Sequence, residues 1–93
     1  MSLQVKWTSG FKKDYKLAMK RGRDIRLLDD TIRMLANQQP LPQKLCDHAL
    51  TGNFRGFREC HIEPDWLLVY GVQKNVLVLT LVRTGTHSDL FGE

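Results

Sequence analysis

Hydrophobic positions alternate with polar ones at the start of the chain and then change to a helical spacing. Every second residue from Leu3 to Trp7 is apolar, which predicts a strand with one buried face over residues 3–8. From Phe11 the apolar residues recur every three or four positions. This spacing predicts a helix that Gly22 ends in a left-handed cap.

A second helix is predicted directly after the first. Asp24 is a typical N-cap residue, and the apolar stripe behind it has the i, i+3, i+4 spacing of a helix with one buried side. Two prolines within residues 37–42 end this helix, because a proline lacks the backbone donor and clashes with the preceding turn. The stripe consists of Ile25, Leu28, Ile32, Leu35 and Ala36.

The second half of the chain has the pattern of strands joined by turns. Aromatic and β-branched residues lie on both sides of Glu63-Pro64-Asp65, where the proline favours a turn, so we expect a hairpin within residues 54–70. A turn over residues 71–75 leads to a Val/Leu run from Val76 to Val82. Such a continuous apolar run predicts a strand that is covered on both faces.

The predicted order of elements is β-α-α-β-β-β. After the last strand, residues 83–87 are expected to leave the sheet, and residues 88–91 to form a short terminal turn or helix. A helical hairpin followed by a meander belongs to the α+β class, with both helices on one face of a mainly antiparallel four-stranded sheet. The 42% hydrophobic share suffices for one domain with a small core, residues 1–93.

Charge is distributed unevenly along the chain. Fourteen Lys and Arg against ten Asp and Glu give a formal net charge of +4, and eight basic but only two acidic residues lie within residues 6–26. This excess permits nucleic-acid binding. No apolar segment approaches the roughly 20 residues of a membrane span, and no signal peptide is recognisable. We therefore expect a cytoplasmic protein with its two cysteines reduced.

Side chains suited to acid–base chemistry lie in the second half of the chain. Antiparallel neighbours run in opposite directions, so the start of the third strand should lie beside the end of the fourth. Histidine can give or take a proton near neutral pH, and arginine can neutralise a phosphate. Cleavage of RNA through its 2′-hydroxyl needs a base, an acid and a cation. The candidates are His48, His61, Asp65, Arg83 and His87, with Trp66 and Phe91 as aromatic neighbours.

Short motifs give nearly the whole chain a resemblance to a known family. They are Asp47-His48, Gly56-Phe57-Arg58, His61-Ile-Glu-Pro-Asp-Trp66 and Arg83-Thr-Gly-Thr-His87, preceded by the basic helical segment. In this order and spacing they resemble the YafQ branch of the RelE/ParE toxin superfamily. The resemblance implies a RelE-like α+β fold with the helical pair packed on the sheet.

The resemblance also implies an activity and partners. Members of this branch are toxins of type II toxin–antitoxin systems and ribosome-dependent endoribonucleases, which cut mRNA in the ribosomal A site. The implied partners are the ribosome, mRNA and a DinJ-like antitoxin. Operator DNA would be bound only by the complex with the antitoxin. Positive charge on the two helices suggests that the antitoxin has an acidic, partly disordered segment. No metal and no cofactor are expected.

Roles for the candidate residues follow from this resemblance. His87 is the expected general acid, Asp65 and His61 share base and proton-orienting duties, and Arg83 neutralises the scissile phosphate. His48 is a further catalytic candidate. Aromatic side chains are expected to pack against nucleotides or shape the pocket, and basic ones to hold RNA backbone. The aromatic residues are Trp66 and Phe91. The basic residues are Arg55, Lys12, Lys13, Lys16 and Lys20.

Other interpretations stay open. A ParE-like toxin that inhibits a protein such as DNA gyrase would need no His/Asp cluster, and a plain nucleic-acid-binding module would use the basic helices alone. A lysine stripe is by default a solvated helix face. Cys46-x-His48 and Cys60-His61 contain zinc-ligand types, but they lack the usual C-x₂-C or H-x₃₋₅-H spacing. The cysteines are therefore expected to be small packing residues.

Overall fold

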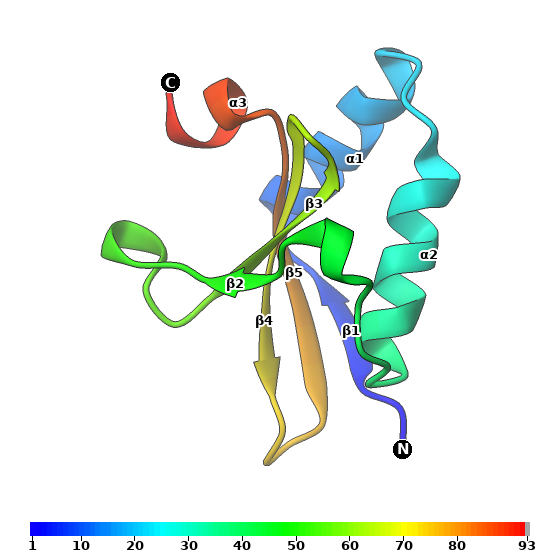
Figure 1. Ribbon diagram of the computed structural model, residues 1–93, viewed down its shortest axis with the longest axis vertical. Helices are drawn as coiled ribbons and strands as arrows, with labels where there is room; N and C mark the ends of the chain where they lie inside the picture. Colours follow the sequence, from blue (N-terminus) through cyan, green and yellow to red (C-terminus); the bar gives the residue numbers. More distant parts are fainter. Residues whose placement is uncertain (93) are drawn as a thin grey trace.

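The computed structural model describes residues 1–92 as a five-stranded sheet with helices (Figure 1). The strand order is β1-β5-β4-β3-β2; β1 runs parallel to β5, and the other neighbouring pairs are antiparallel. The predicted α+β class is confirmed. The elements are β1 (Gln4–Trp7), α1 (Ser9–Lys20), α2 (Ile25–Ala36), η1 (Gln43–Leu45), β2 (His48–Ala49), η2 (Gly52–Phe54), β3 (Arg58–Glu63), β4 (Trp66–Gln73), β5 (Val78–Gly85) and α3 (His87–Phe91).

The predicted helix boundaries agree with the structure. Thr8 caps α1, its Oγ1 accepting a hydrogen bond from the backbone N–H of Phe11 at 3.0 Å. Gly22 follows α1 with φ of 76°, a conformation that only glycine adopts without strain. The side chain of Asp24 accepts from the N–H of Arg26 and caps α2. Local capping chemistry thus sets the helical hairpin.

The prediction of four strands was wrong by one. The additional strand, β2, has only two residues: His48 pairs with Glu59 and Ala49 with Arg58. Both β2 residues are exposed, so no hydrophobic period marked them as a strand. Its pairing to β3 nevertheless fixes the position of His48 beside the sheet.

Two strand ends also differ from the sequence prediction. Residues 54–57 lie in η2 and a turn, and β3 starts at Arg58. At the other end, β5 continues to Gly85 instead of ending at Val82, because Arg83 and Thr84 still pair with β4. The segment before α3 is therefore held in the sheet almost to His87.

Helices α1 and α2 cover one face of the sheet. Phe11 of α1 and Leu28 of α2 are fully buried, and they join one hydrophobic cluster with Leu68, Tyr70 and other residues of the strands. Leu3, directly before β1, is buried too, while Trp7 at the end of β1 is 39% exposed. The predicted helical stripe therefore faces the core.

The opposite face carries a lighter cover. Leu67 and Val69 of β4 are fully buried but lie outside the cluster with the helices, since alternate strand residues point to opposite faces. Phe57 lies over Gly71, where a Cβ would come within 2.9 Å of its ring. Figure 1 shows α3 and the loop after β2 on the side of the sheet away from α2. We call this side the open face.

Within residues 1–92, no helix has the length and apolar character that a bilayer crossing requires.

Candidate active site

Three histidine rings lie next to one another on the open face. His48 comes from β2, His61 from β3, and His87 is the first residue of α3. The ring centroids are 6.2 Å apart between His48 and His61, and 5.7 Å apart between His61 and His87. Strand pairing thus brings together residues that are almost forty positions apart in the sequence.

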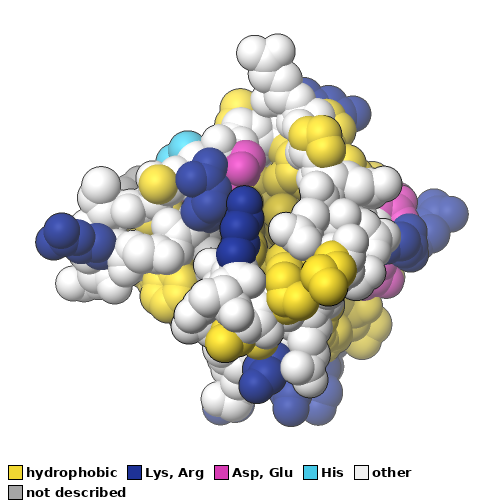
Figure 2. Space-filling model, turned by 90° about the horizontal axis from the view of Figure 1, so that it is seen from below, with side chains coloured by type: hydrophobic (Ala, Val, Ile, Leu, Met, Phe, Trp, Pro, Cys, Tyr) yellow, Lys and Arg dark blue, Asp and Glu magenta, His cyan; other side chains and the backbone are white. Residues whose placement is uncertain are grey.

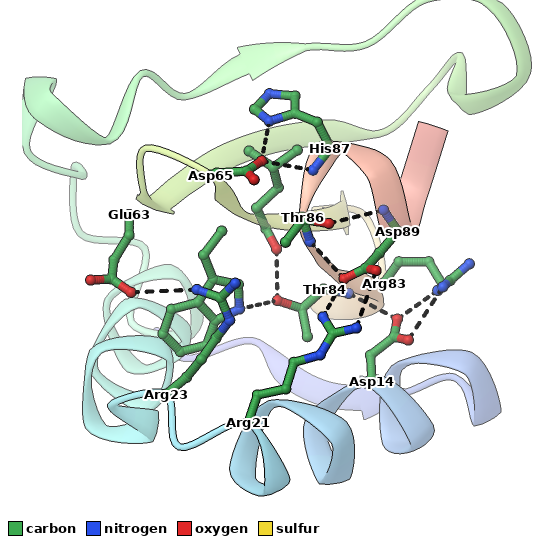
Figure 3. Close-up of polar contacts among 12 residues, drawn as sticks. Asp14, Arg21, Arg23, Glu63, Asp65, Arg83, Thr84, Thr86, His87 and Asp89 are labelled. Atoms are coloured by element: carbon green, nitrogen blue, oxygen red, sulfur yellow. Dashed lines mark hydrogen bonds and ion pairs between the residues drawn. The ribbon is translucent and has the colours of Figure 1, made fainter. Parts of the chain in front are cut away.

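Asp65 holds His87 from the β3–β4 turn. Its Oδ1 accepts a hydrogen bond from the backbone N–H of His87 at 2.9 Å and lies 2.6 Å from Nδ1 of the same residue (Figure 3). An ionised carboxylate can only accept, so Nδ1 carries a proton and Nε2 is left for exchange. The backbone N–H of His87, and then its ring, hold the pKa of Asp65 below its usual value. Asp65 therefore remains a charged acceptor.

Glu59 is a member of the site that the sequence analysis missed. It is only 4% exposed, and its Oε1 lies 3.5 Å from Nε2 of His48 and 3.4 Å from Nε2 of His61. A signal was present in the sequence, because residues two apart on a strand share a face and Glu59 precedes His61 by two. Contact with His48 required the unpredicted β2 pairing.

The same three side chains could hold a metal ion. One ligand atom each from His48, Glu59 and His61 lies within 4.8 Å of the others. Nδ1 of His48 is 2.7 Å from the carbonyl oxygen of Cys46, and Nδ1 of His61 is 3.3 Å from that of Pro64. Metal-binding histidines commonly use one nitrogen in this way while the other faces the ion. Two imidazoles and a carboxylate suit zinc or copper.

Arg83 does not join the histidines, contrary to the expected convergence. Its Nε lies 2.5 Å from Oδ2 of Asp14 on α1, and its Nη2 lies 3.2 Å from Oδ1. Figure 3 shows the guanidinium turned toward Asp14 and away from His87. This ion pair joins residues that lie 69 positions apart in the sequence. A uniform strand pattern could not predict it.

The two aromatic candidates differ in access. Trp66 is fully buried, its Nε1 donates to Oγ1 of Thr84 at 3.0 Å, and the guanidinium carbon of Arg23 lies 5.2 Å from its ring centre. A fully buried Trp66 cannot stack on a nucleotide, so that alternative does not fit the structure. The other predicted role, shaping the pocket, does fit. Phe91 is half-buried and meets Phe54 edge to face at 5.4 Å.

The basic candidates lie on exposed surface. Arg55 follows η2 and is exposed. The four lysines on α1 are exposed as well, on the side away from buried Phe11 and Ala18. Their positions are compatible both with RNA contact and with a solvated helix face. These lysines are Lys12, Lys13, Lys16 and Lys20.

Two hollows flank the strands that carry the site. One has a volume of about 500 Å³ and is lined by His61, Leu45 and Pro64 among others. The other, of about 490 Å³, contains Asp47, which accepts hydrogen bonds from the hydroxyl of Tyr70 and from Arg58. The molecule is hollowed on the side shown in Figure 2, where basic side chains lie beside apolar ones. Its hydrogen bonds with Tyr70 and Arg58 allow Asp47 to anchor the start of β2.

Comparisons with known proteins identify the family of this chain. Residues 3–92 match the family described as bacterial toxin of type II toxin-antitoxin system, YafQ. The chain is 40% identical over 89 residues to the mRNA interferase toxin YafQ of Escherichia coli K12, covering 95% of both chains. It is 33% identical over 92 residues to a putative toxin YafQ of Haemophilus influenzae, covering 94% of this chain and 90% of the other.

Solved structures show the same fold. The E. coli DinJ–YafQ toxin–antitoxin complex contains a chain that matches with a TM-score of 0.89 and 39% identity, over 99% of this chain and 100% of that one. A metal-bound toxin from Helicobacter pylori matches with a TM-score of 0.90 and 46% identity, over 96% and 99% of the two chains.

Proposed function

This chain belongs to the YafQ family of bacterial toxins of type II toxin–antitoxin systems, and from this membership we propose that it is an mRNA interferase, an endoribonuclease that cuts mRNA in the ribosomal A site. The observation that carries the proposal is the row of three histidines, with Asp65 bound to His87. The E. coli relatives named mRNA interferases support it.

The proposed reaction is general acid–base catalysis without a metal. A base removes the proton of the 2′-hydroxyl, whose oxygen then attacks the adjacent phosphorus. The bond from phosphorus to the 5′-oxygen breaks, and an acid protonates that oxygen. The products are a 2′,3′-cyclic phosphate and a 5′-hydroxyl, so no water, oxidant or cofactor is consumed.

His87 fits the acid. Its Nδ1 proton is directed at Asp65, so a protonated ring can donate from Nε2 to the leaving oxygen while Asp65 stabilises the imidazolium. Asp65 accordingly takes the orienting role rather than that of the base. His61 is then the base: its ring centroid lies 5.7 Å from that of His87, so both rings can reach the same phosphodiester. Glu59 orients His61, and His48 lies behind Glu59.

Arg83 and Phe91 lie at the margins of this site. Arg83 uses two nitrogens on Asp14, its side chain is 35% exposed, and no hydrogen bond from its Nη1 is found within residues 1–92. We assign it to neutralising the phosphate through that exposed end. Phe91, which packs against Phe54 of η2, and Arg55, which follows η2, would contact the RNA. Trp66 supports the site from within the core.

The proposal extends to partners and place. The lysines of α1 would bind ribosomal RNA, and the toxin would act in the bacterial cytoplasm as one domain of residues 1–93. The E. coli DinJ–YafQ complex supports a DinJ-like antitoxin as the partner. The basic residues of the helical hairpin favour an acidic, partly disordered segment in that antitoxin. Operator DNA would be bound only through that complex.

The decisive experiment is primer extension on a defined mRNA in a reconstituted translation system. Wild type should cut within the A-site codon. His87→Ala should reduce cutting at least about 100-fold, since a positioned acid contributes this much. Ser88→Ala is the matched control: its side chain is exposed and adjacent, and it should cut like wild type. Cutting by His87→Ala at the wild-type rate would refute the acid, and no cutting by folded wild type would favour a protein-binding toxin.

A chelation experiment tests the metal-free mechanism. The toxin is treated with EDTA and desalted before ribosomes are added, because ribosomes themselves need Mg²⁺. Unchanged cutting would support acid–base catalysis alone. Loss of cutting that zinc or copper restores would instead place an ion on His48, Glu59 and His61.

A further inference from the structure

An ion pair joins the end of α1 to α3 across 68 positions of sequence. Nη1 of Arg21 lies 2.6 Å from Oδ2 of Asp89, and its Nη2 lies 3.4 Å from Oδ1 (Figure 3). Arg21 is the C-cap residue of α1, whose body is fixed by burial of Phe11 and Ala18. Arg21 therefore provides an anchor for Asp89 on a well-packed element.

Asp89 in turn determines the backbone immediately before His87. Its Oδ2 accepts from the N–H of Thr86 at 3.0 Å, and its own N–H donates to Oγ1 of Thr86 at 3.0 Å, which makes a capping box. Arg21 foremost, and then the Thr86 N–H, lower the pKa of Asp89 to about 2. The first turn of α3 is thus tied to α1 through one carboxylate.

The strand side leaves Asp89 little freedom. A Cβ on Gly85 would lie 3.0 Å from both Cβ and Oδ2 of Asp89, so the side chain lies directly on the end of β5. Glycine is needed there because a side chain would collide with Asp89. The backbone of Gly85 lies in the ordinary region, so its conformation does not require glycine. Asp89 is consequently fixed from the strand below and from the helix beside it.

We propose that Arg21 and Asp89 are positioning residues for His87: together they fix the first turn of α3, so that the backbone N–H and the ring of His87 both reach Asp65. The inference rests on the proposed function, because it assigns to the pair a purpose in RNA cleavage. Neither residue touches the His87 ring in the hydrogen bonds of residues 1–92, so both act through the backbone.

The pair matters for local order more than for overall stability. The two side chains are 41% and 27% exposed, and ion pairs so accessible to water add little to global stability. Helix α3 has only five residues, too few to be stable alone, and therefore depends on such contacts. Loss of the pair should loosen α3 and leave the core intact.

The first test measures single-turnover cleavage by ribosome complexes. Arg21→Met keeps an apolar stem but removes the charge, and Asp89→Asn keeps an oxygen for the Thr86 N–H but removes the ion pair. Each should lower the cleavage rate roughly tenfold without changing ribosome affinity, because a catalytic group is misplaced. The double variant should be no slower than the slower single variant. Arg33→Met, which breaks the exposed Arg33–Asp30 pair of 2.8 Å on α2, should cut like wild type.

The second test needs no cleavage. The Asp65 carboxyl is titrated by ¹³C NMR, and in Arg21→Met its pKa should rise toward the ordinary carboxyl value, because the His87 N–H no longer meets it. Arg33→Met should leave it unchanged. If Arg21→Met and Asp89→Asn both cut RNA at the wild-type rate and both keep the wild-type pKa of Asp65, the inference is overturned. If wild type itself cuts no RNA, the proposed function fails, whereas an unchanged Asp65 titration would separately reject the positioning.

Discussion

The two faces of β3 show how this small protein separates stability from chemistry. Cys60 and Ile62 point toward the helices, where they belong to the hydrophobic cluster. Glu59 and His61 point to the open face, where each meets a titratable neighbour. Glu59 is almost as buried as Cys60, so the faces differ in the chemistry of their neighbours more than in burial.

This difference indicates where stability comes from. Apolar burial against α1 and α2 stabilises the fold, whereas a buried carboxylate costs free energy unless it is paired. A protein can hold such a carboxylate when the other face supplies enough stability, as functional sites commonly require. Substitutions on the helix-covered face should therefore change unfolding, and substitutions on the open face should change RNA cleavage.

The largest effect is expected on the helix-covered face. Leu28→Ala should lower the free energy of unfolding by about 2–5 kcal/mol, because it leaves a cavity at a fully buried position. Its neighbour Leu27 is 39% exposed, and Leu27→Ala should cost about 0.5 kcal/mol or less. Urea unfolding measures both. Equal losses at the two positions would show that α2 does not pack as the structure has it.

A smaller effect, on RNA cleavage and not on unfolding, is expected from Glu59→Gln. The amide has the same size but no charge, so His48 and His61 lose their shared carboxylate. RNA cleavage should fall at least about tenfold, while unfolding changes by about 1 kcal/mol or less. Glu63→Gln, at the exposed end of the same strand, is the control. Full cleavage by Glu59→Gln would remove Glu59 from the mechanism.

Acid should loosen the open face before the core through Asp89. Its folded-state pKa of about 2 is below the ordinary carboxyl value near 4, so its contribution is complete above that ordinary value. The contribution falls as the pH decreases from about 4 and is lost below about 2. NMR hydrogen exchange should show the amides of Leu90 in α3 and of Gly92, its C-cap, losing protection over this range in wild type. If the amides of α2 lost protection over the same pH range, the open face and the helix-covered core would not respond separately to acid.

The smallest perturbation is chemical labelling of the cysteines. Burial raises the pKa of the Cys60 thiol to about 12, whereas Cys46 is exposed. Iodoacetamide should therefore modify Cys46 and spare Cys60 in the native protein, as mass spectrometry of peptides can show. Urea-unfolded protein, labelled at both, is the control. Labelling of native Cys60 would mean that the helix-covered face opens readily.

The helix-covered face could largely be predicted from the sequence. Leu28 and Leu35 follow the helical period because they bury one side of α2, and Thr8 and Asp24 have side chains that cap locally. These signals lie within a few residues of the feature that they predict. The α+β class follows from the order of such local elements.

The open face could be predicted only in part. His61, Asp65 and His87 stood out by residue type and motif, but Glu59 acquires its role from contact with His48 through a two-residue strand. Arg83 was misplaced because it pairs with Asp14 of α1, which lies 69 positions earlier in the sequence. Such features depend on pairing between distant segments, which no local period encodes.

The parallel pairing of β1 with β5 has a consequence for the synthesis of the protein. Gln4 is the partner of Val78, so the N-terminal strand cannot take its place until the C-terminal strand has been made. Contacts between such distant segments delay folding. His87 comes shortly after β5, and the nascent chain therefore completes the edge that carries His87 late. For a toxin that acts on ribosomes, as we propose, this order of folding would keep the chain inactive until its synthesis is nearly complete.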